Sequence, residues 1–199
     1  MKKAMLYIHG KGGSAAEAEH YRGLCPGYDV VGVDYRGDTP WETKEEIADA
    51  YDRLREQYDT VRLIANSIGA YFAMNALAGK RVERAFFISP IVDMEKLITD
   101  MMAWAGVTEE ELRARQEIET AFGETLSWEY LCYVREHPVI WDTSTAILYA
   151  GGDHLTARET VSAFAEKTGA SVRIMEDGEH WFHTAEQMRF LDDWITGNR

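Results

Sequence analysis

A serine stands where a short apolar strand should turn sharply into a helix. Ser67 follows the mostly apolar run Val61–Ala65, and the alanine-rich segment Ala70–Ala78 comes directly after it. Small residues, Ala65 and Gly69, lie two positions before and after the serine, where bulky side chains would collide across so tight a turn. A hydroxyl placed there is accessible and lies beside N–H groups of a helix N-terminus, which can stabilise an anion. The pattern therefore predicts that Ser67 can act as a nucleophile.

A serine hydroxyl becomes nucleophilic when a base accepts its proton, and a carboxylate holds that base in the correct tautomer. Asp153 follows the strand-like run Thr145–Ala150 and a Gly-Gly turn. His180 follows the next strand-like run, Ser171–Met175, and a second turn. The order Ser67, Asp153, His180 along the chain is the one expected for a catalytic triad at one edge of a parallel sheet. We predict that His180 is the base and that Asp153 orients it.

A glycine-rich loop follows the first expected strand, in the run His9-Gly10-Lys11-Gly12-Gly13. Glycines allow the backbone to turn its N–H groups toward a developing oxyanion. We predict that the donors are the N–H of Lys11 and that of Ile68, directly after the serine. Loss of one such donor typically costs about 2.7–4 kcal/mol of transition-state stabilisation.

Short β-like runs alternate with helical segments along the chain, and most of these runs lack polar alternation, as strands buried on both faces do. The expected strands are Ala4–Ile8, Tyr28–Asp34, Thr60–Ala65, Arg84–Ile88, Thr145–Ala150 and Ser171–Met175. Capping-box pairs predict helix starts at Ser14/Glu17, Thr43/Glu46, Thr108/Glu111, Thr156/Glu159 and Thr184/Gln187, and glycines predict helix ends at Gly79, Gly169 and Gly197. This alternation predicts an α/β fold, with a mainly parallel sheet between two layers of helices.

The alternation breaks once, between Ile88 and Thr145, where we find no convincing strand. We predict a helical lid insertion at about 94–140 within a single domain spanning 1–199. An insertion of this length is more often functional than structureless. Its aromatic and Met side chains, together with one tryptophan beside the predicted base, are candidates for binding substrate. These candidates are Met101, Trp104, Trp128 and Trp181.

Composition sets further bounds on the function. The chain has 199 residues, 46% of them hydrophobic, and a formal net charge of −13, which disfavours a nucleic-acid partner. Cys25 and Cys132 are isolated, as expected for reduced thiols. The apolar run Ala4–Ile8 is too short for an export signal, and no stretch reaches membrane-spanning length. We therefore expect a cytoplasmic protein with no membrane partner, and the sequence indicates no oligomeric state.

Taken together, these features resemble the α/β-hydrolase superfamily over nearly the whole chain. The resemblance rests on the His9-Gly10 loop, the run Gly32–Gly37, the serine turn, Gly151–Asp153 and Gly178–Phe182. It implies a six-stranded sheet in the order 4-3-5-6-7-8, with the two usual N-terminal strands missing, and a lid at the insertion. One departure from the family pattern is Ala65, where glycine is usual.

Alternative assignments remain open within the site. His183 lies three residues after His180 and could replace it as the base. The two histidines and Asp153 could also bind a metal, but too few further ligands cluster nearby and we expect no metal site. Asp93 is the alternative acid, or else a helix N-cap. His9 is expected to hold its loop by a hydrogen bond, and His154 to face solvent.

Two rival classes of protein also remain. The run from Gly10 to Ala15 fits G-x-G-x-x-A after a strand, and Asp34 ends the next strand, as in a nicotinamide-dinucleotide-binding oxidoreductase. A non-catalytic binding protein on a hydrolase scaffold is the other alternative. The sequence favours a serine hydrolase that cleaves a carboxylic ester, or an amide or thioester, of a small acyl substrate through an acyl-enzyme, without a cofactor.

Overall fold

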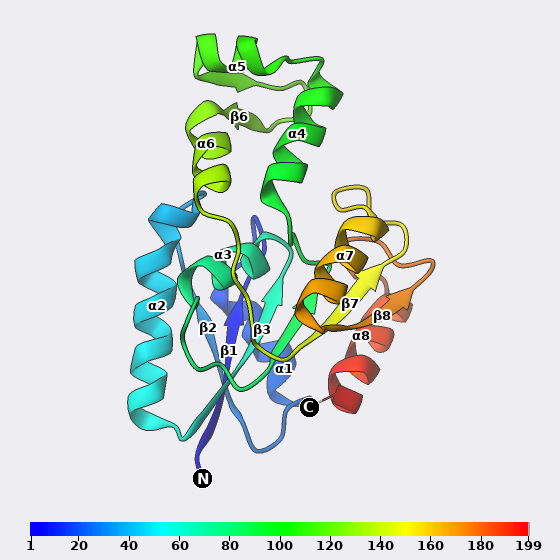
Figure 1. The fold of residues 1–199 in the computed structure, drawn as a ribbon. Helices are drawn as coiled ribbons and strands as arrows, with labels where there is room; N and C mark the ends of the chain where they lie inside the picture. The colour runs from blue at the N-terminus through cyan, green and yellow to red at the C-terminus, as the bar shows by residue number, and fades with distance from the viewer. Residues whose placement is uncertain (199) are drawn as a thin grey trace. The chain divides into compact units, whose positions relative to one another are not determined.

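A computed structural model describes residues 1–198 of the chain, which form two compact units, and the larger unit is built on a six-stranded parallel sheet (Figure 1). The strands are β1 (Lys3–Ile8), β2 (Asp29–Val33), β3 (Thr60–Asn66), β4 (Ala85–Ile88), β7 (Thr145–Ala150) and β8 (Ser171–Met175). They are ordered β2-β1-β3-β4-β7-β8, and every neighbouring pair is parallel. This is the order 4-3-5-6-7-8 when β1 is counted as the family's third strand. The predicted α/β fold class is confirmed.

The central strands are apolar because both of their faces are covered. All residues of β4 and β7 are buried, whereas the edge strand β8 has no fully buried residue. The helices of this unit are a short 3-10 turn η1 (Ala15–Glu17), α1 (Ala18–Arg22), α2 (Pro40–Gln57), α3 (Ile68–Ala76), α7 (Arg158–Thr168) and α8 (Ala185–Asn198). Helices α1 and α8 cover one face of the sheet, and α2, α3 and α7 cover the other (Figure 1).

The register aligns the carboxyl ends of the strands at one edge of the sheet. Ile8 pairs with Val33 on β2 and with Ala65 on β3. Ile88, the last residue of β4, pairs with Asn66 and Leu148. Residues that follow these strands therefore meet at the same edge, which is where the sequence analysis expects the site.

Four helix boundaries differ from the predictions. Helix α3 ends at Ala76 with Leu77 as its C-cap, three residues before Gly79, where the sequence predicts the end. Helix α2 begins at Pro40 and is capped by Thr39 with Glu42, so Thr43 lies buried inside the helix rather than at its start. The N-cap of α7 is Ala157 instead of Thr156, and Gly197 lies within α8 rather than ending it. The capping boxes at Ser14 and Thr108 are present as predicted, and Gly169 caps α7 in the left-handed conformation.

Residues Asp93–Val139 form a second compact unit. It contains α4 (Met94–Ala105), α5 (Glu109–Arg115), β5 (Glu117–Glu119), β6 (Thr125–Ser127) and α6 (Trp128–Glu136). The prediction of a strandless insertion is wrong here, because β5 and β6 pair as an antiparallel hairpin of three residues each. The hairpin buries only Ile118 and Leu126, and its other residues are polar, which hides the strand pattern.

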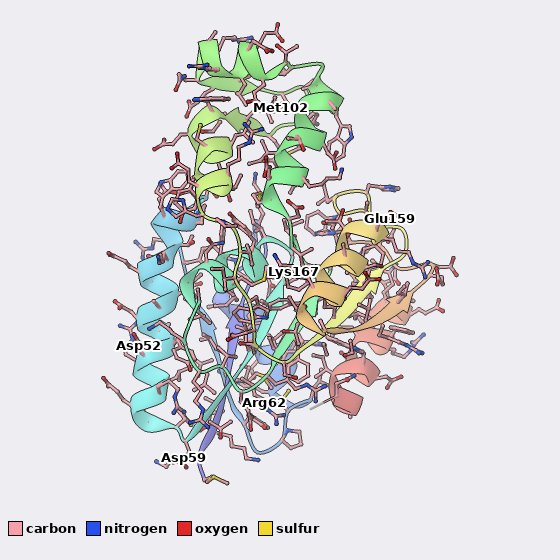
Figure 2. The ribbon with its side chains drawn as sticks, in the orientation of Figure 1. Asp52, Asp59, Arg62, Met102, Glu159 and Lys167 are labelled. Atoms are coloured by element: carbon pink, nitrogen blue, oxygen red, sulfur yellow. The ribbon has the colours of Figure 1, made fainter. Side chains whose placement is uncertain are left out.

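Each of the two units carries ion pairs on its surface. Arg135 on α6 donates to Glu95 and Glu109, within the second unit. In the sheet unit, Lys80 pairs at 2.7 Å with Asp52, whose side chain lies on the outer face of α2 (Figure 2). Among residues 1–198, we find no helix with both the length and the apolar content of a membrane span.

Candidate active site

Ser67 occupies a strained turn between β3 and α3. Its backbone has φ 51° and ψ −123°, a conformation that L-residues adopt rarely and that structures tolerate mainly where function requires it. Two backbone hydrogen bonds hold the turn: Ser67 N donates to Ile88 O at 2.9 Å, and Ile91 N donates to Ser67 O at 3.1 Å. Hydrogen bonds between the segments at the ends of β3 and β4 therefore hold the backbone of Ser67 in this conformation.

The glycine-rich loop packs directly on the serine turn. A Cβ added at Gly69 would lie 2.3 Å from the carbonyl oxygen of His9, and a Cβ added at Gly10 would lie 3.2 Å from Ser67 Cβ. At Gly69 the added atom would meet backbone, and at Gly10 it would meet the Cβ of the serine, so neither site accommodates a side chain without movement. This close packing explains why small residues are required around Ser67 and brings the loop beside its hydroxyl.

His180 lies between Ser67 and Asp153. Its Nε2 is 2.8 Å from Ser67 Oγ, and its Nδ1 is 2.7 Å from Asp153 Oδ2. The carboxylate side chain is fully buried, and His180 is 7% exposed. With Nδ1 donating to the carboxylate, Nε2 is left as the acceptor for the serine hydroxyl.

Backbone N–H groups hold the carboxylate of Asp153 through the oxygen that does not face His180. Oδ1 accepts hydrogen bonds from Leu155 N at 2.8 Å and from Thr156 N at 3.3 Å, which leaves Oδ2 for His180. The Gly151-Gly152 turn before it packs on the β8 exit, because a Cβ at Gly151 would lie 2.3 Å from Glu176 O. Gly152 N also donates to Gly178 O at 2.9 Å. The loops that present the acid and the base are thus joined through their backbones.

The glycine-rich loop that begins at His9 has a second support, which the sequence analysis did not assign. Tyr35 stacks on His9 with ring centroids 4.1 Å apart, and its hydroxyl donates to His9 O at 2.6 Å. Burial raises the pKa of the Tyr35 hydroxyl, so it keeps its proton and remains a donor. The available signal was an aromatic residue at the end of the expected strand Tyr28–Asp34, in the same glycine-bounded run that carried the resemblance.

The two predicted oxyanion donors, Lys11 and Ile68, directly follow Gly10 and Ser67, which pack against each other. Ile68 is the first residue of α3, where backbone N–H groups have no acceptor inside the helix. Lys11 occupies the second position of a turn closed by a hydrogen bond from Gly13 N to Gly10 O at 3.1 Å. His9 Nδ1 lies 2.8 Å from Gly10 O, so this histidine holds the loop as expected.

The alternative residues have other roles in the structure. Asp93 caps α4, where its side chain accepts from Lys96 N at 2.9 Å. His183 is exposed and lies 3.4 Å from Glu179, and His154 is exposed as expected. Within residues 1–198, no three His, Cys, Asp or Glu side chains form a group suited to a metal ion.

The dinucleotide-binding alternative gains no support from the loop geometry. Asp34, the acid that would bind a ribose, accepts a hydrogen bond from Ala15 N at 3.0 Å. A Cβ at Gly13 would lie 2.5 Å from Glu17 Oε1, so the Glu17 side chain fills the space beside the last glycine of the loop. The helix that follows, α1, has only five residues, a weak dipole for a pyrophosphate.

The candidate substrate-binding residues fall in both units. Met101, Trp104 and Trp128 belong to Asp93–Val139, where Trp104 contacts the ring of Phe122 and Trp128 lies under the guanidinium of Arg113. Trp181 belongs to the sheet unit, next to His180 in the chain. Binding of substrate by these four residues stays a prediction.

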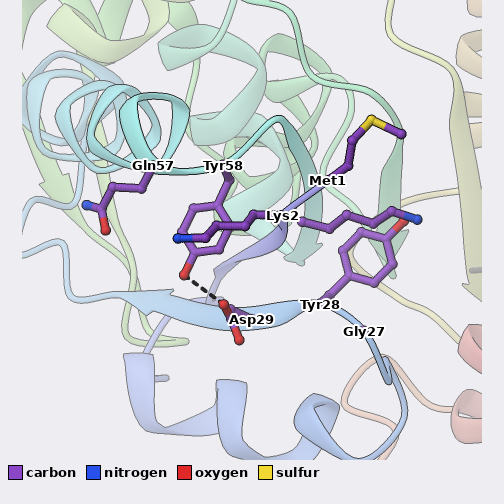
Figure 3. A pocket seen from close by; sticks show the side chains of 8 residues that line it. Met1, Lys2, Gly27, Tyr28, Asp29, Gln57 and Tyr58 are labelled. Atoms are coloured by element: carbon purple, nitrogen blue, oxygen red, sulfur yellow. Dashed lines mark hydrogen bonds between the residues drawn. The ribbon is translucent and has the colours of Figure 1, made fainter.

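A hollow of about 320 Å³ lies at the opposite end of the sheet. It is lined by the start of β1 and by Tyr28, Asp29 and Tyr58, whose hydroxyl donates to Asp29 at 2.9 Å (Figure 3). Because it borders the amino ends of the strands, it is separate from the Ser67, His180 and Asp153 cluster.

Comparison with solved structures identifies the fold. The chain resembles Est1E from Butyrivibrio proteoclasticus with a TM-score of 0.79 and 15% identity, over 99% of this chain and 87% of that one. Mouse α/β-hydrolase domain-containing protein 10 gives 0.75 and 16%, over 98% and 88%. A lipase-esterase related protein from Clostridium acetobutylicum gives 0.64 and 15%, over 98% and 94%.

No protein-family model matches the sequence, and no curated protein matches it significantly. The structural likeness extends over nearly the whole chain. The chain therefore has the fold of the α/β-hydrolase superfamily.

Proposed function

We propose that this protein is a serine hydrolase that cleaves carboxylic esters of small to medium acyl groups. The observation that carries the proposal is the unbroken hydrogen-bonded chain from Asp153 through His180 to Ser67, at 2.7 and 2.8 Å. The strained backbone at Ser67 supports it, because such strain is retained where it displays a reacting group. Structural neighbours described as hydrolases and as lipase-esterase related support the hydrolase class.

In the proposed acylation step, Ser67 Oγ attacks the ester carbonyl carbon while His180 Nε2 accepts the hydroxyl proton. The carbonyl electron pair moves to oxygen, and the backbone N–H groups of Lys11 and Ile68 stabilise this oxyanion. When the tetrahedral intermediate collapses, the bond from carbon to the alcohol oxygen breaks. The alcohol leaves with that electron pair and takes the proton from His180.

In the proposed deacylation step, water replaces the alcohol and His180 removes its proton. The hydroxide attacks the acyl carbon, the bond to Ser67 Oγ breaks, and the serine recovers a proton from the imidazolium. Asp153 stabilises the imidazolium in both steps through Nδ1 and prevents the ring from rotating. All groups required for these steps belong to the chain, so the proposal includes no metal or organic cofactor.

Labelling with a fluorophosphonate tests the nucleophile. We expect intact-mass analysis to show one adduct, and peptide mapping to place it on Ser67. The Ser67→Ala variant should take up no label and lose turnover of p-nitrophenyl acetate and butyrate by at least about a thousandfold.

Ser89 provides a matched control for this experiment. It also follows a strand and has positive φ, and it is fully buried. The Ser89→Ala variant should still be labelled on Ser67. A Ser67→Ala protein that keeps full esterase activity, or a label found mainly on another residue, would contradict the proposed function.

A further inference from the structure

The residue after the proposed base has an exposure unlike that of its neighbours. Trp181 is 62% exposed, whereas His180 is 7% and Phe182 2% exposed. A single exposed aromatic residue on a protein surface requires no explanation by itself. This one differs because its ring lies 5.1 Å from the imidazole of His180, centroid to centroid, with the ring planes at 83°.

The loop that carries Trp181 is fixed rather than loosely attached. Phe182 adopts φ 45°, and its side chain packs in the core cluster that includes Leu191 and Trp194 of α8. Phe182 N also donates to Glu179 O at 3.0 Å. Since Phe182 points into the core, Trp181 projects outward beside the imidazole.

Proton transfer defines what this indole can contact. In the proposed acylation step, the leaving alcohol oxygen must come within about 2.6–3.2 Å of His180 Nε2 to receive its proton. The substituent on that oxygen therefore lies within a few bonds of a ring that contacts the same imidazole. The acyl group, by contrast, is bonded to Ser67 and directed at the oxyanion donors.

From this geometry we propose that Trp181 forms the leaving-group subsite and favours esters of neutral aromatic alcohols. The inference rests on the proposed function and specifies the substrate class for the same site. Aromatic rings attract one another at centroid distances of about 4.5–7 Å beyond the effect of buried area alone. The turn before His180 carries Glu176, Asp177 and Glu179, so an anionic alcohol is disfavoured there.

Three acetate esters isolate the leaving group: benzyl, cyclohexylmethyl and methyl acetate. They share one acyl group, and the first two alcohols have similar size and basicity but differ in flatness and aromaticity. In wild-type protein we expect kcat/KM to be highest for benzyl acetate. The Trp181→Leu variant should reduce the ratio of benzyl to cyclohexylmethyl kcat/KM by roughly two- to tenfold, and Trp181→Phe should restore most of it.

Deacylation supplies a measurement that a purely structural role would change. All three esters form the same acetyl-enzyme, and the alcohol has left before water attacks. The rate constant for acetyl-enzyme hydrolysis should therefore be the same in wild type and in Trp181→Leu. Tyr58→Leu, which removes an aromatic side chain at the opposite end of the sheet, should leave the ester ratio unchanged.

Three other outcomes would contradict the proposal. An unchanged ester ratio in Trp181→Leu would overturn the leaving-group subsite. So would an equal loss for all three esters together with slower deacylation, because Trp181 would then only support His180. If no acetyl-enzyme forms on Ser67 in wild type, the proposed function fails and the subsite fails with it.

Discussion

The carboxyl ends and the amino ends of the parallel strands differ in backbone conformation and in the polar side chains that lie there. At the carboxyl ends, Ser67, Ser89 and Phe182 all have positive φ, although none is glycine. Buried polar side chains gather there too, including His9 and His180. Among residues 1–198, the Ser89 hydroxyl is buried without a hydrogen-bond partner, and nothing in the structure explains it.

The amino ends show ordinary solvent-facing pairs. Asp59 accepts from the backbone N–H of Lys2 at 2.7 Å, and Arg62 pairs with Glu83 at 2.6 Å (Figure 2). Lys3 and Arg62 both lie over the ring of Tyr28. Buried polar groups are not confined to the carboxyl ends, because Thr143 and Thr145 are buried at the start of β7. The non-glycine residues with positive φ in the sheet unit, and its buried histidines, do lie at the carboxyl ends, and this is the end that carries the proposed chemistry.

The largest difference between the two ends is expected in kcat, when one carboxylate charge is removed from each end. Asp153→Asn should lower kcat by about a thousand- to ten-thousandfold, because an amide favours the wrong tautomer of His180. Asp29→Asn, at the amino end, should leave kcat within twofold. Steady-state hydrolysis of p-nitrophenyl acetate measures both variants.

The same assay separates the two candidate acids. Asp93→Asn keeps the N-cap of α4, because asparagine caps helices as well as aspartate does. Its activity should therefore match wild type. A large loss in Asp93→Asn with little loss in Asp153→Asn would reverse the assignment of the acid.

A methyl group added at each end tests the backbone packing. Gly69→Ala should lower the free energy of unfolding by on the order of 3 kcal/mol, because its Cβ would meet the backbone of His9 at 2.3 Å. Activity should fall as well, since the glycine-rich loop that carries the proposed oxyanion donor must move.

Gly23 is the matched glycine toward the amino ends. It has helical angles, φ −69° and ψ −28°, and no atom within 4 Å of an added Cβ. Gly23→Ala should therefore stabilise the protein by about 0.4–1 kcal/mol. Urea unfolding of both variants gives the comparison, and equal stabilities would show that the Gly69 contact relaxes easily.

The sequence could predict the elements that depend on local pattern. The central strands β4 and β7 are apolar because both of their faces are buried, and the acid and the base are predicted by following β7 and β8 to their ends. The start of α2 was misplaced because two overlapping capping signals, Thr39/Glu42 and Thr43/Glu46, compete there. Pro40 decides between them, since proline suits the first position of a helix.

Contacts between distant segments could not be predicted in this way. Tyr35 supports His9 from the end of another strand, and no spacing rule connects the two residues. The 2.8 Å approach of His180 to Ser67 depends on loop conformations set by Phe182 and Gly152. Both contacts depend on packing between segments that are distant in the chain, and no periodic pattern in the sequence reports such packing.

A smaller difference in stability and in kcat is expected between two tyrosine variants, one at each end of the sheet. Tyr35→Phe leaves the buried carbonyl of His9 without its donor, so we expect a loss of about 1–2 kcal/mol in stability and a lower kcat with similar KM. Tyr58→Phe removes an exposed hydroxyl that donates to Asp29, and should change neither Tm nor kcat. Thermal unfolding and steady-state kinetics test both variants, and equal Tm losses would contradict the contrast.

The smallest effect is expected at the amino end itself, for the pair formed by Arg62 and Glu83. The Arg62 side chain is 17% exposed and that of Glu83 48%, so the pair is partly screened by water. A double-mutant cycle with Arg62→Met and Glu83→Gln should give a coupling of about 0.2–1 kcal/mol, falling as salt is added. Activity should stay at the wild-type level in all three variants. A coupling of several kcal/mol, or a loss of activity, would mean that the amino end is also a tightly constrained region, and the contrast between the two ends would then no longer distinguish the site.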